Sequence, residues 1–204
     1  MRRVVIILVI ASAAYPQAPP EQDQRARQQY SRLTTNPTRD SWQMPDQVVA
    51  ALGLKSSEVV ATLGDGEGYF ARRIAPLAGR VYVIDKNPAL LTAANKEAPP
   101  TVATIAGTMS NLTSRVLQVD TILVANTLGQ TADRVAFFRS LSAVLKPNGR
   151  VVVIDFFKGA PPPGLPAQQQ ITEAAITQDL NSAGFHFVQR LTFLPYQFFV
   201  IFQR

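Results

Sequence analysis

A short apolar segment that runs into alternating glycines constrains the fold of this chain more than any other feature. Residues 59–63 read VVATL, and Gly64, Gly66 and Gly68 follow at every second position. Glycine adopts positive φ angles and lets the backbone approach a ligand closely. In open α/β sheets, ligands bind at loops that leave the carboxyl ends of the strands. The segment therefore predicts a strand, a ligand-binding turn and a helix, in that order.

Strand-like and helix-like segments alternate through the middle of the chain. Pro45 can open a helix over 46–52, before the first strand. Alternation of this kind indicates βαβ units with right-handed crossovers and a mostly parallel sheet. The predicted strands are 58–63, 80–84, 101–105, 121–125 and 150–156, and the predicted helices between them are 68–75, 87–98 and 131–145.

The alternation of strands and helices ends near the C-terminus, where a helix over 171–183 is followed by two strand-like segments, 185–194 and 197–203. The connection between these two segments is too short to hold a crossover helix, so they must pair antiparallel. The predicted fold is therefore a Rossmann-like α/β fold, with a doubly wound, mostly parallel seven-stranded sheet that ends in a C-terminal antiparallel hairpin.

Asp85 ends the second predicted strand, close to the spacing of roughly 20 residues at which a ribose-binding acid follows the glycines. A carboxylate at this place can accept hydrogen bonds from both ribose hydroxyls. A dinucleotide fingerprint would require a glycine at position 69, where this chain has Tyr69. That residue and the terminal hairpin oppose a nucleotide-dependent oxidoreductase. Two plainer interpretations stay open, namely glycines that serve only the turn and an Asp85 that merely ends its strand.

The composition excludes several kinds of chemistry. The chain has no cysteine, which rules out disulfides, cysteine-bound metals and cysteine nucleophiles. Its single histidine, His186, stands at the entry to a predicted strand and is interpreted as structural, which opposes a Ser-His-Asp hydrolase. The formal net charge is +6, but the basic residues are scattered, so no nucleic-acid partner is expected.

The first 14 residues have the order of a secretory signal peptide, with Arg2 and Arg3, an apolar run over 4–10 and small residues after it. The run is shorter than the roughly 20 residues that span a bilayer, so no stable membrane span is expected after cleavage. An uncleaved anchor or a strand of a cytoplasmic protein are the alternatives. We expect an exported protein, periplasmic or secreted, with a signal peptide at 1–14, a polar linker with a short helix at 15–40, and one domain at 41–204.

Three sequence segments carry a resemblance to a known family. They are LGDGEGYF at 63–70, GRVYVID at 79–85 and LKPNGR at 145–150, preceded by Trp42 and Pro45. Together they resemble the class I S-adenosylmethionine-dependent methyltransferases, in particular the exported or membrane-associated bacterial members.

The resemblance implies S-adenosylmethionine as the cofactor and a small apolar or aromatic molecule as the methyl acceptor. In the cofactor site, the glycines would pass under the methionine part, Asp85 would hold the ribose, and Asn126 would face the reactive end. The implied cofactor-binding residues are Gly64, Asp65, Gly66, Gly68, Asp85, Lys86, Thr108, Met109 and Asn126. The implied acceptor-binding residues are Tyr30, Trp42 and Phe156, and the alternative for Trp42 and Phe156 is that they are ordinary core residues.

The sequence departs from the family pattern at three places. Thr62 stands where the family has an acid, Thr108 replaces an aspartate after Gly107, and residues 127–129 lack the histidines that many relatives carry. Two interpretations follow, an active methyltransferase or a non-catalytic methyltransferase-fold module that has lost cofactor contacts. No catalytic base is assigned. Asp155, after the fifth strand, is a candidate, and a strand-ending acid is its alternative.

Overall fold

The structure is a computed structural model and describes residues 36–96, 98–107, 118–159 and 171–204. Within these ranges, no helix combines the length and the apolar character that crossing a bilayer requires. The predicted signal peptide, the linker helix, Tyr30, Thr108 and Met109 lie outside the described residues.

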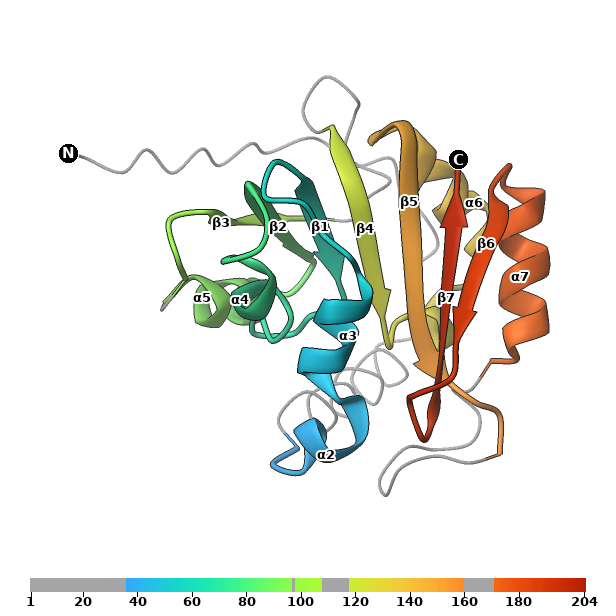
Figure 1. The fold of residues 1–204 in the computed structure, drawn as a ribbon, viewed down its shortest axis with the longest axis horizontal. Helices are drawn as coiled ribbons and strands as arrows, with labels where there is room; N and C mark the ends of the chain where they lie inside the picture. The colour runs from blue at the N-terminus through green and yellow to red at the C-terminus, as the bar shows by residue number, and fades with distance from the viewer. Residues whose placement is uncertain (1–35, 97, 108–117, 160–170) are drawn as a thin grey trace.

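Seven strands form one sheet in the order β3-β2-β1-β4-β5-β7-β6 (Figure 1). Neighbouring strands among the first five pair parallel, whereas β7 pairs antiparallel with both β5 and β6. The predicted seven-stranded sheet and its terminal hairpin are therefore confirmed. The strands are β1 (Val59–Leu63), β2 (Arg80–Asp85), β3 (Val102–Ala106), β4 (Val119–Ala125), β5 (Leu145–Phe156), β6 (His186–Leu191) and β7 (Gln197–Gln203).

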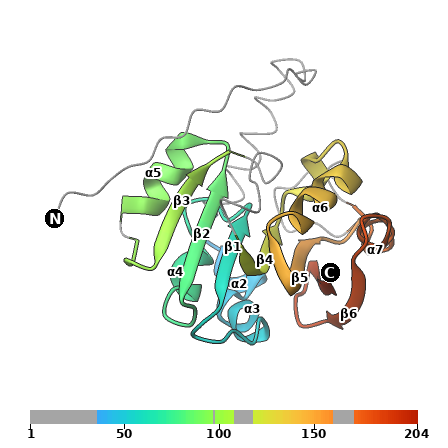
Figure 2. The same cartoon turned by 90° about the horizontal axis from the view of Figure 1, so that it is seen from above.

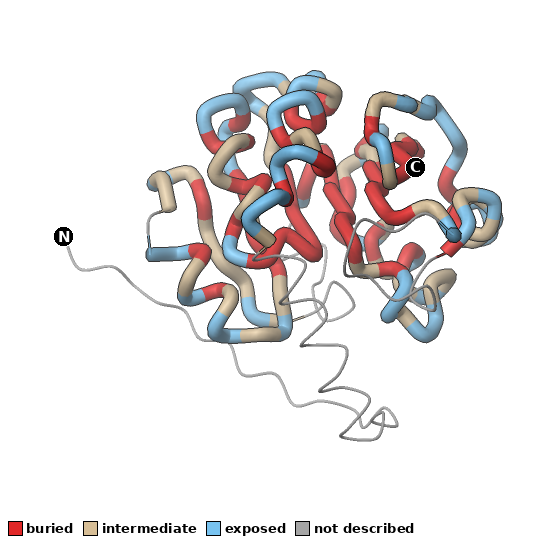
Figure 3. The backbone as a smooth tube through the Cα atoms, turned by 90° about the horizontal axis from the view of Figure 1, so that it is seen from below, coloured by how far each residue is buried: buried red, intermediate tan, exposed pale blue. Residues whose placement is uncertain are grey.

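Helices cover both faces of this sheet (Figure 2). Buried residues of α3, α4 and α5 form one core with the sheet, and those of α6 and α7 form a second core on the other face. Burial is accordingly concentrated in the strands, while loops and outer helix faces are exposed (Figure 3). The helices are α2 (Arg39–Gln43), α3 (Pro45–Ala51), α4 (Ala71–Ile74), α5 (Pro88–Lys96), α6 (Arg134–Ser142) and α7 (Glu173–Ser182), with a 3-10 turn η2 (Leu128–Gln130).

Capping groups explain where the helices begin. The predicted start of α5 is confirmed, since the Asn87 side chain accepts a hydrogen bond from the Ala89 N–H at 3.0 Å and Pro88 holds the first position. The predicted helix at 131–145 is three residues shorter at its front, because Asp133 caps it by accepting from the Ala136 N–H. The helix expected at 68–75 is shorter in the structure, where it is α4. Neither α2 nor η2 was predicted.

The parallel register brings the carboxyl ends of the strands to one edge of the sheet, where α2 lies below the arrowheads of β4 and β5 in Figure 1. Leu63 of β1 pairs with Ile84 of β2 and with Val124 of β4, and Ala125 pairs with Ile154 of β5. The glycine loop, Asp85, Asn126 and Asp155 therefore all start at this edge. His186, in contrast, lies exposed on the outer strand β6.

Gly64 is required by packing inside the protein. Its φ is +72°, and a Cβ placed on it would lie 1.8 Å from the Ala125 carbonyl oxygen and 2.4 Å from the Thr127 methyl group. The turn after β1 therefore touches the end of β4 through a position that has room only for hydrogen.

We expect Gly64→Ala to destabilise the protein more than Gly53→Ala. Gly53 also has a positive φ, +55°, but a Cβ there would meet nothing within 4 Å. Both variants carry the strain of a left-handed alanine, about 1–2 kcal/mol, and only Gly64→Ala adds a backbone clash, which we expect to cost about 2 kcal/mol more. Urea unfolding of the three proteins measures the difference, and equal losses would contradict the packing role.

Candidate functional site

The glycine loop between β1 and α4 is held in shape by its own carboxylate. Gly64, Gly66 and Gly68 have φ angles of 72°, 65° and 81°. Between them Asp65 turns inward and is 1% exposed. Its Oδ1 accepts from the Phe70 N–H at 2.5 Å, and its Oδ2 accepts from the Ala71 N–H and the Thr62 hydroxyl, both at 3.0 Å. Asp65 thus joins the end of β1 to the first residues of α4.

The same contacts clarify the departure at Thr62. Thr62 is fully buried, and its hydroxyl donates to the carboxylate three positions further along the chain. Burial raises the pKa of Asp65, while the N–H groups of Phe70 and Ala71 and the charge of Arg39 act in the opposite direction. A carboxylate is therefore present at the loop, but its oxygens hold the backbone. Direct contact of Asp65 with a cofactor stays a prediction. The other acid of the loop, Glu67, is exposed.

Asp85 lies at the end of β2, half-buried, beside this loop. Its Oδ1 accepts from the Asn87 N–H at 2.7 Å, and its backbone carbonyl accepts from the Gly107 N–H at the end of β3. Burial raises the pKa of Asp85, and the negative charge of Asp65 adds to that rise, whereas the Asn87 N–H and Lys86 oppose it. Lys86 itself is exposed.

Asn126 stands directly after β4 in the left-handed region, with a φ of 57°. Its N–H donates to the Ile154 carbonyl at 2.9 Å, and its side-chain Oδ1 accepts from Gln197 Nε2 at 2.5 Å. Gln197 is the first residue of β7 and is fully buried. Gln197 was not among the predicted site residues, because one polar residue at the start of an apolar strand gives no signal of its own.

Two of the three predicted acceptor-binding residues meet in the structure. The ring centroids of Trp42 and Phe156 are 5.6 Å apart, both side chains are buried, and Tyr196 packs against them. Trp42 belongs to α2, a helix the sequence did not predict, which also carries the buried polar residues Arg39 and Gln43.

Several buried polar atoms at this end of the sheet have no hydrogen-bond partner among the described residues. Buried polar groups are bonded in the great majority of cases, and an unmade bond costs about 1–3 kcal/mol. The atoms come from α2, from the turn after β4 and from the start of β7. A polar ligand would satisfy them. They are Trp42 Nε1, Gln43 Nε2, Asn126 Nδ2, Thr127 Oγ1 and Gln197 Oε1.

Asp155 connects the turns after β4 and β5. Its Oδ2 accepts from the Leu128 N–H at 3.0 Å and its Oδ1 from the Phe156 N–H at 2.8 Å. Burial raises the pKa of this carboxyl to about 6, and the two N–H groups limit the rise. Because both oxygens already bind backbone groups, the geometry favours a strand-ending acid over a general base.

Tyr69 links the glycine loop to α2. Its hydroxyl donates to Asp40 Oδ1 at 2.6 Å, and Arg73 binds the other oxygen of Asp40 at 3.1 Å. The guanidinium carbons of Arg39 and Arg73 lie 3.6 Å and 4.5 Å from the centre of the Tyr69 ring. The helix that carries Trp42 is thereby attached to the loop that follows β1.

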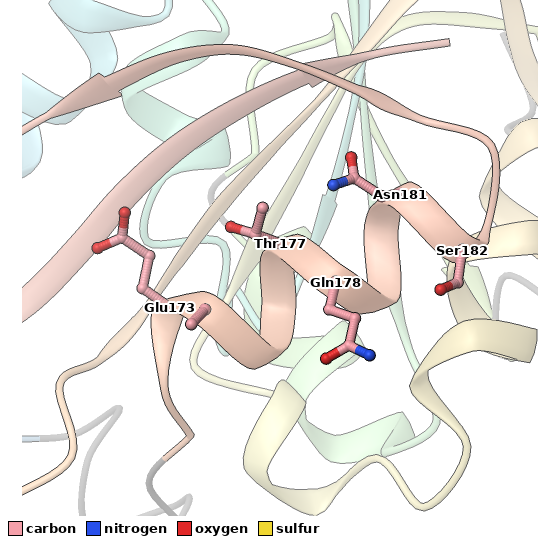
Figure 4. A pocket seen from close by; sticks show the side chains of 6 residues that line it. Glu173, Thr177, Gln178, Asn181 and Ser182 are labelled. Carbon is pink, nitrogen blue, oxygen red and sulfur yellow. The ribbon is translucent and has the colours of Figure 1, made fainter.

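A surface hollow on α7 lies away from these residues, next to the outer strands of the sheet. One face of that single helix lines it (Figure 4), and Glu173 in its wall is already paired with Arg190 at 2.9 Å. The described residues also contain no group of three or more side chains suited to hold a metal ion. The carboxyl edge of the sheet is therefore the candidate site.

Comparison with known proteins agrees with this geometry. Residues 61–153 match the family model described as "Methyltransferase domain". The structure aligns with a SAM-dependent methyltransferase from Aquifex aeolicus at a TM-score of 0.74 and 22% identity, covering 92% of this chain and 99% of that one. No match to the chain is found among curated protein sequences.

Two further solved structures share the fold. The magnesium protoporphyrin IX methyltransferase ChlM from Synechocystis PCC 6803, with bound SAH, aligns at a TM-score of 0.65 and 19% identity, over 91% of this chain and 95% of that one. The N-methyltransferase NodS from Bradyrhizobium japonicum WM9 aligns at a TM-score of 0.64 and 16% identity, covering 84% of this chain and 99% of that one.

The chain has the fold of the S-adenosylmethionine-dependent methyltransferases. The match to the methyltransferase domain model spans residues 61–153, somewhat less than half of the chain.

We expect the contribution of Asp155 to stability to fall as the pH rises. The folded carboxyl has a pKa of about 6, above its ordinary value of 3.8, so the folded state binds the proton more tightly. The resulting stabilisation is complete below about pH 4 and is lost as the pH passes about 6. Between about pH 4 and pH 7, the difference in unfolding free energy between the wild type and Asp155→Asn should change by on the order of 2 kcal/mol. Denaturant titrations at several pH values measure this, and a difference independent of pH would refute it.

We expect Tyr69→Phe to loosen α2 without disturbing the sheet. The variant loses one hydrogen bond to Asp40, a contribution of about 1 kcal/mol. Amide hydrogen exchange should become faster over residues 39–43 and stay unchanged in β4 and β5. Tyr82→Phe on β2 is the matched control. Unchanged exchange in α2 would show that Tyr69 does not hold it.

Proposed function

We propose that this protein transfers a methyl group from S-adenosylmethionine to a small-molecule acceptor. One observation carries the proposal. The glycine loop and Asp85 lie at the ends of adjacent parallel strands, and the same edge of the sheet holds the five unpaired buried polar atoms.

The residues on the cofactor side fit the group. Gly66 and Gly68 have positive φ angles and no side chain, so no Cβ would separate a ligand from the backbone of this turn. Asp85 is half-buried beside this turn and supplies the carboxylate that a ribose requires. Thr62 and Asp65 keep the loop in this shape through buried hydrogen bonds.

The residues on the acceptor side have a positioning role. When bound, S-adenosylmethionine supplies an electrophilic methyl group carried on a sulfonium sulfur. Much of the rate of a displacement comes from holding the two reactants in line. Trp42 and Phe156 supply a buried aromatic wall for the acceptor, and Asn126 places an amide between that wall and the glycine loop. No protein base is required where the acceptor loses its proton readily.

We expect calorimetric titration of the full chain with S-adenosylhomocysteine to detect binding, and Asp85→Asn to weaken it about tenfold or more. The substitution keeps the size of the side chain and removes the charged acceptor, and hydrogen bonds to charged groups contribute about 1.5–3 kcal/mol. Glu67→Gln, an exposed acid in the same loop, is the matched control and should leave the affinity unchanged.

Each failure has a distinct meaning. No binding to the wild type at millimolar ligand would overturn the proposed function and favour a methyltransferase-fold module without cofactor. Equal affinities of the wild type and Asp85→Asn would leave cofactor binding in place but remove Asp85 from the ribose site.

A further inference from the structure

A pair of buried amides lies at the carboxyl edge of the sheet, and one of them, Asn126, is the residue that the family resemblance places at the reactive end of the cofactor. Gln197 Nε2 donates to Asn126 Oδ1 at 2.5 Å, which leaves Asn126 Nδ2 and Gln197 Oε1 without partners among the described residues. Gln197 is 0% exposed and Asn126 6%. If both amide groups are turned round, the pair again leaves one NH2 group and one carbonyl oxygen. The pair therefore offers one free donor and one free acceptor in either orientation.

The amide pair adjoins the aromatic wall. Gln197 lies directly opposite Phe156 in the antiparallel ladder of β5 and β7, so their side chains project from the same face of the sheet as neighbours. Phe156 packs against Trp42, whose indole N–H is itself unpaired. An apolar surface and a donor–acceptor edge thus meet in one place.

The side chains that form this place are uncharged, which favours a neutral ligand over an anionic one. Within the described residues, the side chains of Asn126, Gln197, Trp42 and Phe156 make no ion pair and no hydrogen bond to a charged side chain. The titratable groups around it are Asp155, a buried acid, and Tyr196, which packs against the two rings. The buried cation of α2, Arg39, lies over the Tyr69 ring and binds Gln43 instead. An anion placed here would lose its hydration without a counter-charge, which costs several kcal/mol.

We propose that Asn126 and Gln197 determine acceptor specificity by binding a neutral aromatic molecule that carries a hydrogen-bond donor and acceptor on neighbouring atoms, the pattern of a carboxamide. The assignment of this pair to the methyl acceptor rests on the proposed function. A carboxamide presents its C=O to the free NH2 group and its N–H to the free carbonyl oxygen, while its ring packs beside Phe156 and Trp42. A site built for paired hydrogen bonds rejects analogues that leave them unmade.

The test uses benzamide as the probe, with benzoate and N,N-dimethylbenzamide as analogues, titrated into the full-length protein by calorimetry and ligand-observed NMR with and without S-adenosylhomocysteine. We expect benzamide to bind at least about tenfold more tightly than either analogue. Gln197→Met keeps the side-chain length and removes both hydrogen-bonding groups, and Asn126→Gly suits the positive φ. Each substitution should lower the affinity for benzamide about tenfold or more.

Two matched controls separate recognition from general damage. Gln203→Met is the control for Gln197→Met: it replaces a glutamine at the other end of β7, where the side chain donates to the Asn148 carbonyl. Asn148→Gly is the control for Asn126→Gly, because Asn148 also has a positive φ, 63°. Both should leave benzamide binding unchanged. If Gln197→Met does not fold, the comparison of benzamide binding between Asn126→Gly and Asn148→Gly decides the question.

The outcomes distinguish this inference from the proposed function. Similar affinities for benzamide and benzoate, no saturable benzamide binding, or benzamide binding unaffected in Asn126→Gly would each overturn the inference, even where S-adenosylhomocysteine binds. Selective benzamide binding that requires both amides, in a protein that does not bind S-adenosylhomocysteine, would support the amide site and overturn its role in methyl transfer.

Discussion

The approach of Gly64 to the Ala125 carbonyl is the constraint on which the rest of the site depends. Only a residue without a side chain allows the turn after β1 to lie against the end of β4. This contact sets the glycine loop beside the turn that carries Asn126 and Thr127. Without it, the acid at the end of β2 and the amide after β4 would belong to two separate places on the sheet edge.

The loop shows how charge and geometry are divided among neighbouring residues. Asp65 supplies a negative charge but uses its oxygens on Thr62, Phe70 and Ala71, so it acts as an internal cap for α4. The carboxylate of Asp85 accepts from the Asn87 N–H and is partly open to solvent. The two acids therefore differ in role because Asp65 is fully buried with both oxygens bound, whereas Asp85 stays partly exposed.

The sequence was sufficient for features that depend on local patterns. Apolar runs and turn residues located the strands, the short connection at 194–196 required the antiparallel hairpin, and Asn87 with Pro88 marked a helix start. Trp42 and Phe156, which the family resemblance assigns to one acceptor site, lie in contact, and their role toward an acceptor stays a prediction.

The sequence was insufficient where a contact joins distant parts of the chain or where a helix lacks an apolar stripe. Asn126 and Gln197 are 71 positions apart, and each amide looks like an ordinary polar residue next to a strand. The α2 sequence RDSWQ is too short and too polar to show helical periodicity. The inward turn of Asp65 follows from the backbone N–H groups that surround it, which no spacing of residues reveals.

The position of β7 has a consequence for how the molecule is made. It lies between β5 and β6 in the sheet, yet it follows both of them in the chain. During synthesis, β5 and β6 therefore leave the ribosome before the strand that joins them exists, and β5 keeps one side of its backbone unpaired until then. An unpaired strand edge is a template for unwanted pairing with other chains. When β7 pairs with β5, it covers this unpaired edge and brings Gln197 to Asn126. The amide pair of Asn126 and Gln197 is therefore assembled last.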